Sequence, residues 1–85
     1  MPDFRTMEIK YLNRFGQEQT IVVYQETIRN QVFFRIFCGG EYVIEIFKRE
    51  DGIWEDLYNG PTERSNEYGG LIAGSVMNSS YPRNG

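Results

Sequence analysis

Apolar and polar residues alternate along much of the chain between residues 4 and 58, in short runs separated by clusters of Gly, Asn and Asp. A two-residue period places successive side chains on opposite faces of a β-strand. The pattern therefore predicts five strands, near residues 4–12, 19–25, 31–38, 41–49 and 53–58. Their connections are short, and short connections join antiparallel neighbours, so we expect an antiparallel meander.

Turn residues support these strand boundaries. The pair Gly39-Gly40 between two apolar runs is typical of a two-residue hairpin turn, which needs positive φ at both central positions. Asp51-Gly52 suits a type I turn closed by a glycine in the left-handed region. Asn30 is the expected turn residue between the second and third strands, and Asn13 to Gly16 joins the first two.

After Pro61 the apolar period changes from that of a strand to that of a helix. A stripe at i, i+3, i+4, i+7 and i+8 is formed by Tyr68, Leu71, Ile72, Ser75, Val76 and Ser79. It predicts a helix over about 62–78, with Thr62 or Ser65 as the N-cap. Three glycines, Gly69, Gly70 and Gly74, each cost about 1 kcal/mol in a helix interior, unless they permit a close approach to the sheet.

The fold class predicted is α+β. A single domain spans residues 1–85, with the helix packed on one face of the sheet and a frayed tail at 79–85. A single helix covers only one of the two faces. We expect it to cover the aliphatic set Val32, Phe34, Ile36, Ile44 and Ile46.

The second face carries more aromatic side chains than one helix leaves room to cover. Its expected members are Phe33, Phe37, Val43 and Phe47, with Trp54 and Tyr58 depending on register. Arg35 and Glu45 lie among them as diagonal cross-strand neighbours. Three arrangements would account for an uncovered aromatic face: a sheet that curls closed as a small barrel, a homodimer interface, or a groove for a ligand or partner.

The net charge is −3, and the acidic residues are concentrated in one segment. Residues 41–67 hold eight acidic and three basic side chains, a net charge of −5. Nucleic-acid binding draws most of its affinity from Lys and Arg on phosphate, so this balance argues against it. It is consistent with a basic partner, or with a solvated acidic rim that keeps the protein soluble.

The residues present make catalysis and cofactor binding poor candidates. The chain has no histidine and one cysteine, Cys38, which excludes Ser-His-Asp and Cys-His pairs and the common zinc sites. The carboxylate pairs Glu50-Asp51 and Glu55-Asp56 lack the spacing of a calcium loop. The chain has no long apolar run, no secretory signal pattern and no disulfide framework, so we expect a cytoplasmic protein that does not enter a membrane. We also expect it to bind no cofactor.

We therefore expect a small non-catalytic protein-interaction module. Its partner would be another protein, either a second copy of the chain or a basic protein. It would use the aromatic face or the acidic rim at 41–67. The residues predicted to form this surface are Phe33, Arg35, Phe37, Phe47, Trp54, Tyr58, Glu55 and Asp56. The alternative hypothesis is a small-molecule binder with an apolar cavity between the helix and the curled sheet.

Overall fold

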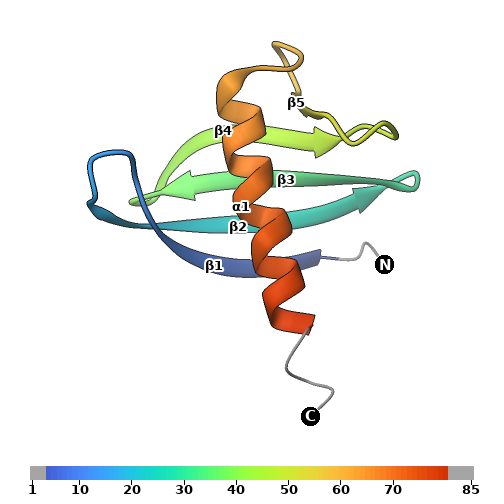
Figure 1. The fold of residues 1–85 in the computed structure, drawn as a ribbon. Helices are drawn as coiled ribbons and strands as arrows, with labels where there is room; N and C mark the ends of the chain where they lie inside the picture. The colour runs from blue at the N-terminus through green and yellow to red at the C-terminus, as the bar shows by residue number, and fades with distance from the viewer. Residues whose placement is uncertain (1–3, 81–85) are drawn as a thin grey trace.

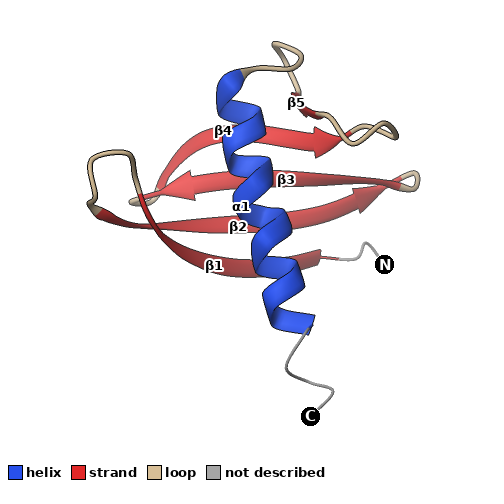
Figure 2. Cartoon of the chain, viewed as in Figure 1, coloured by secondary structure: helices blue, strands red, loops and turns tan. Residues whose placement is uncertain are grey.

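A computed structural model describes residues 4–80, with side chains for residues 5–75. Five antiparallel strands form one sheet in the order β1-β2-β3-β4-β5, and a single helix crosses one face of it (Figures 1 and 2). The elements are β1 (Phe4–Leu12), β2 (Glu18–Ile28), β3 (Gln31–Cys38), β4 (Glu41–Lys48), β5 (Trp54–Asp56) and α1 (Glu63–Ser80). The α+β meander predicted from the sequence is confirmed.

Two tight turns show how local sequence sets the meander. Gly39 and Gly40 have φ values of 62° and 83°, the combination expected of a type I′ hairpin turn. Arg29 and Asn30 form the corresponding turn between β2 and β3 with φ values of 51° and 67°, although neither is a glycine. Asn tolerates the left-handed region better than most residues, which explains why Asn30 marks this turn in the sequence.

The largest differences from the predicted element ends are in β2, β5 and α1. β2 continues to Ile28, and β5 contains only three residues because hydrogen-bonded turns bound it on both sides. The Arg49 N–H donates to the Ile53 carbonyl at 2.8 Å before β5, and the Asp56 N–H donates to the Gly60 carbonyl at 2.8 Å after it. The helix continues to Ser80, two residues past its predicted end; residues 81–85 of the predicted tail lie outside the described part of the chain.

The hydrophobic core lies between the helix and the sheet. Its buried members are Ile9, Ile21, Val23, Phe34, Ile36, Ile44, Ile46, Trp54 and Ile72. All but Ile72 come from strands. The aliphatic set expected under the helix is found there, with Val32 partly buried at its margin.

A β-bulge in β4 exchanges the faces of two residues. Ile36 pairs with Ile44, but Phe37 pairs with Tyr42, which leaves Val43 as the extra residue. Val43 packs against the core, whereas the Tyr42 ring contacts Phe37 on the opposite face, with ring centroids 5.9 Å apart. Alternation along the strand predicted Val43 with the aromatic set, and that assignment was wrong.

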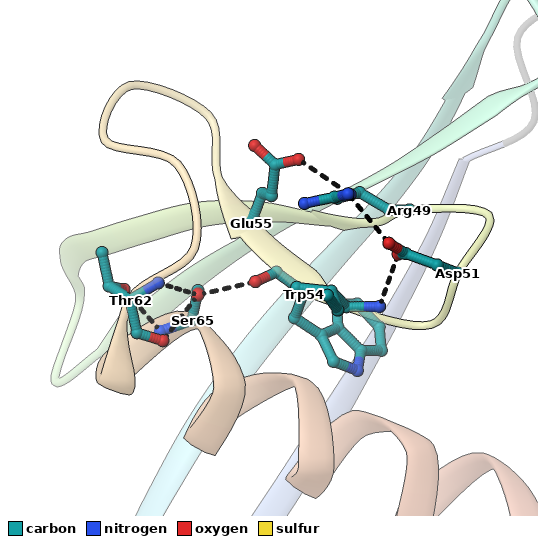
Figure 3. Close-up of polar contacts among 7 residues, drawn as sticks. Arg49, Asp51, Trp54, Glu55, Thr62 and Ser65 are labelled. Carbon is teal, nitrogen blue, oxygen red and sulfur yellow. Dashed lines mark hydrogen bonds and ion pairs between the residues drawn. The ribbon is translucent and has the colours of Figure 1, made fainter.

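The helix begins with a reciprocal cap that also ties it to the sheet (Figure 3). The Ser65 N–H donates to Thr62 Oγ1 and the Thr62 N–H donates to Ser65 Oγ, each at 2.9 Å. The Ser65 hydroxyl, fully buried, also donates to the Trp54 carbonyl at 2.9 Å. Thr62 is therefore the N-cap, and Ser65 serves as the third residue of a capping box.

Gly69 is the glycine that the helix needs for docking. A β-carbon at this position would overlap the Trp54 ring, whereas Gly70 and Gly74 face open space. The close approach expected of these glycines is confirmed for Gly69 alone. Within the described residues, no helix combines the length and apolar character needed to span a bilayer.

Candidate functional site

The face of the sheet away from α1 is not covered by any described helix or strand (Figures 1 and 2). We call it the open face. Its side chains form cross-strand rows made of Val22, Phe37 and Tyr42; Tyr24, Arg35 and Glu45; and Glu26, Phe33, Phe47 and Glu55. The sheet does not close into a barrel, because β1 and β5 remain at opposite ends of the strand order.

Edge-to-face contacts fix the aromatic rings of the open face. Tyr24 and Phe37 lie 5.2 Å apart between centroids at 84°, and Phe33 and Phe47 lie 5.8 Å apart at 60°. Such pairs are favoured by the quadrupoles of the rings. The three phenylalanines are half-buried by their neighbours alone, and Tyr42 is 49% exposed. The rings therefore form a preordered apolar surface that no other described element covers.

Arg35 crosses the middle of this surface between two carboxylates. Its Nη2 lies 3.4 Å from Glu26 Oε1 and its Nε lies 3.7 Å from Glu45 Oε1. Because of the bulge, Glu45 is the direct cross-strand partner of Arg35 and not the diagonal neighbour that the sequence predicted. These three charges sum to −1, so the centre of the open face keeps an excess of negative charge.

The β5 side of the open face is also ionic. Arg49 Nε lies 3.4 Å from Glu55 Oε2, and Arg49 Nη2 lies 2.8 Å from Asp51 Oδ2 (Figure 3). Of the carboxylates considered for a cation, Asp51 and Glu55 are thus paired with Arg49. Among the described residues, no group of three or more His, Cys, Asp or Glu side chains is arranged to hold a metal ion.

The structure divides the eight residues predicted for the interaction surface. It brings five of them together on the open face: Phe33, Arg35, Phe37, Phe47 and Glu55. Tyr58 lies beyond β5 in the connection to α1 and is 76% exposed.

Trp54 and Asp56 lie on the helix-covered face, so they cannot contribute to the open face. Trp54 pairs with Lys48, whose Nζ lies 5.9 Å from the indole centroid, and its ring packs 5.5 Å from that of Phe34. The register of β4 with β5 decides this placement, and the turn at Asp51 and Gly52 sets that register.

Asp56 has a structural role at the end of β5. Its carboxylate accepts hydrogen bonds from the Tyr58 N–H at 2.9 Å and from Asn59 Nδ2 at 3.1 Å. The Tyr58 hydrogen bond lowers the pKa of Asp56 most; burial opposes this shift, while Asn59 and the charge of Arg64 add to it. The charged carboxylate therefore organises the connection between β5 and α1.

Sequence reasoning missed the contribution of β2 to the open face. Val22, Tyr24 and Glu26 lie beside Phe37, Arg35 and Phe33 respectively. Their alternation in the sequence was the available signal. It was obscured because Ile21 and Val23, on the other face, are apolar as well.

The helix docks too closely on the sheet at Gly69 to leave an apolar cavity against Trp54. A hollow of about 490 Å³ lies elsewhere, outside the N-terminal half of the helix. Its lining is polar and consists of Arg14, Glu63, Arg64, Asn66, Glu67 and Tyr68. This lining does not match the aromatic cavity expected of the small-molecule alternative.

Comparison with protein-family models, with curated proteins and with solved structures yields no match to this chain. The residues and their geometry therefore provide the basis for a functional proposal.

Proposed function

We propose that this protein is a non-catalytic binding module whose open face takes another protein, one that presents apolar side chains next to a cationic group. The observation that carries the proposal is the preordered aromatic surface around Arg35, which no described element covers. Uncovered aromatic surface of this extent is uncommon in a monomer and usually marks an interaction site.

The size of the open face suits a specific complex. The five strands contain 39 residues, and at about 4.8 Å between strands and about 3.3 Å rise per residue they give a projected area of about 600 Å². Stable protein complexes bury about 800 Å² of accessible surface on each partner. The open face and its rim therefore approach the area needed without a second surface.

The composition of the open face favours a protein partner. Aromatic and arginine side chains dominate binding energies at protein interfaces. Glu26 and Glu45 together carry one more charge than Arg35, so the centre of the open face has a net negative charge. This charge would favour a Lys or Arg side chain on the partner and disfavour an acidic side chain. A partner arginine placed over the rings would gain cation–π energy as well.

Photo-crosslinking from the open face tests this proposal. A benzoylphenylalanine at Tyr42, which is 49% exposed on the open face, should form a crosslink in cells to one identifiable protein. The matched control carries the same group at Phe15, which is 78% exposed in the turn between β1 and β2. The captured protein should then bind the purified wild-type chain, and bind Phe37→Ser at least tenfold more weakly.

If crosslinking to proteins other than a second copy of the chain is no greater from position 42 than from position 15, the proposal is contradicted. So would a captured protein whose affinity is unchanged by Phe37→Ser, provided that circular dichroism shows the variant folded. A crosslink to a second copy of the chain would replace the proposed partner with a face-to-face homodimer.

A further inference from the structure

The two edges of the sheet differ sharply. β5 contains only three residues, Trp54–Asp56. The bridge between Asp56 and Gly60 then closes a turn, and Pro61 follows. β1 is nine residues long, pairs with β2 without a register shift from Phe4 to Leu12, and contains no Pro, Gly or bulge. Long, regular edges of this kind are templates for further strand pairing, and proteins usually block them.

The hydrogen-bond pattern identifies which backbone groups β1 directs outward. The Asn13 N–H donates to the Gln17 carbonyl at 2.9 Å, in the same register as the β1–β2 ladder. Since hydrogen-bonded pairs alternate in an antiparallel ladder, the odd-numbered residues of β1 bond to β2. The even-numbered residues Thr6, Glu8 and Lys10 therefore direct their backbone groups away from the sheet.

Among antiparallel registers centred on Glu8, Ile9 and Lys10, the charges on β1 favour one. An antiparallel register centred on Glu8 places Glu8 against Glu8, and one centred on Lys10 places Lys10 against Lys10. A register centred on Ile9 places Glu8 of each copy opposite Lys10 of the other, twice. Both residues are exposed, and the outward backbone groups fall into hydrogen-bonded pairs in this register.

We propose that two copies of this chain join their β1 strands antiparallel about Ile9 and form a continuous ten-stranded sheet. Residues opposite each other then share a face, so both helices lie on one side and both open faces on the other. The proposal goes beyond the binding function and leaves the open face available. A dimer of this kind would present two open faces side by side to a partner.

The length of the helix agrees with an extended sheet. At about 1.5 Å per residue, the 18 residues of α1 span about 27 Å, whereas five strands at about 4.8 Å spacing span about 19 Å. Figure 1 shows the C-terminal end of α1 projecting past β1. In the proposed dimer, the β1 strand of the partner copy continues the sheet in that direction.

Charge-swap variants test the pairing, with mass measured by light scattering and dissociation constants by analytical ultracentrifugation at low salt. The wild-type chain should dimerise, whereas E8K and K10E should each weaken the dimer about tenfold through like-charge contacts. An equimolar mixture of E8K and K10E should dimerise again, because every Glu8–Lys10 contact becomes complementary between the two variants. The double variant E8K/K10E should likewise recover the wild-type affinity.

A second variant blocks the strand edge directly. Glu8→Pro removes an outward N–H and no β1–β2 hydrogen bond, so it should abolish the dimer. A wild-type chain that stays monomeric at millimolar concentration would overturn the proposal. A mixture of E8K and K10E that is no more dimeric than either variant alone would also overturn it. This comparison does not depend on whether Glu8→Pro folds. Phe37→Ser should leave the dimer intact, which separates this result from a failure of the open-face proposal.

Discussion

Gly69 of the helix lies directly against the indole ring of Trp54, so close that a β-carbon on the helix would overlap the ring. This contact sets the distance between helix and sheet. Three neighbouring interactions support it: Trp54 packs on Phe34, its carbonyl accepts a hydrogen bond from Ser65, and Ser65 closes the N-cap with Thr62. Helix position, cap and core are therefore coupled at a single tryptophan.

Replacing Gly69 with alanine should destabilise the protein by about 1–3 kcal/mol, because the added methyl group overpacks the contact with Trp54. Gly70→Ala and Gly74→Ala are the matched controls. They face open space and should stabilise the fold by about 0.5–1 kcal/mol each, since alanine loses less backbone entropy on folding. Urea unfolding measures all three. A Gly69→Ala variant as stable as Gly70→Ala would show that the contact does not limit helix docking.

Ser65→Ala should cost about 1–3 kcal/mol, because it leaves the buried Trp54 carbonyl without its donor and opens the cap. Thr62→Ala, which removes only the N-cap acceptor, should cost about 1 kcal/mol. The exposed neighbour Asn66→Ala serves as the control and should change stability little. Thermal unfolding measures the stability of all three variants. A Ser65→Ala variant as stable as Asn66→Ala would contradict this order.

Acid should weaken the connection between β5 and α1. The pKa of Asp56 lies below its usual value because the Tyr58 N–H, and also Asn59 and Arg64, stabilise the charged form against burial. The unfolded chain therefore binds this proton more readily than the folded one. The stabilisation is present above about pH 4 and is lost as pH falls through the folded pKa. Asp56→Asn should reduce the acid dependence of stability measured from pH 5 to pH 2; an unchanged acid dependence would contradict this role.

Tyr11 should be among the last groups to ionise in base. Burial, together with the charge and hydrogen bond of Tyr68, raises the pKa of Tyr11 to about 12. Because the unfolded chain releases this proton at about pH 10, stability should fall as pH rises from about 10 toward 12. Ultraviolet titration of Tyr11→Phe should lack the phenolate step near pH 12. If the phenolate step near pH 12 persisted at full amplitude in this variant, it would belong to another tyrosine.

Two adjacent residues distinguish the core from the open face. Ile36 is fully buried, so Ile36→Ala should cost about 2–4 kcal/mol. Phe37 is half-buried on the open face, and Phe37→Ala should cost about 1 kcal/mol in the monomer. Chemical denaturation at low protein concentration measures both. Equal losses would show that the open face is covered as fully as the core.

Local chemistry explains which parts of the fold were predictable. Gly39, Gly40 and Asn30 occupy conformations that few other residues adopt, so they mark the turns in the sequence. Alternation along β3 marks both of its faces, since Arg35 interrupts the apolar residues on only one of them. Phe33, Arg35 and Phe37 of the open face followed from this pattern, and alternation along β4 added Glu45 and Phe47.

The assignments that failed depend on contacts between distant residues. Tyr42 and Val43 are both apolar, so alternation does not reveal the bulge that exchanges them. Trp54 turns toward the helix because of its register with Lys48 and its fit against Gly69, neither of which has a local sequence signature.

The sequence by itself determined the order of strands, the turns, the helix and the existence of two apolar faces, because backbone propensity and periodicity act over a few residues. The tertiary structure alone decided which face Trp54 and Tyr42 occupy, which glycine contacts the sheet, and that Glu26 of β2 joins Arg35 and Glu45 at the centre of the open face. Those features arise from register and packing between segments that only the folded chain brings together.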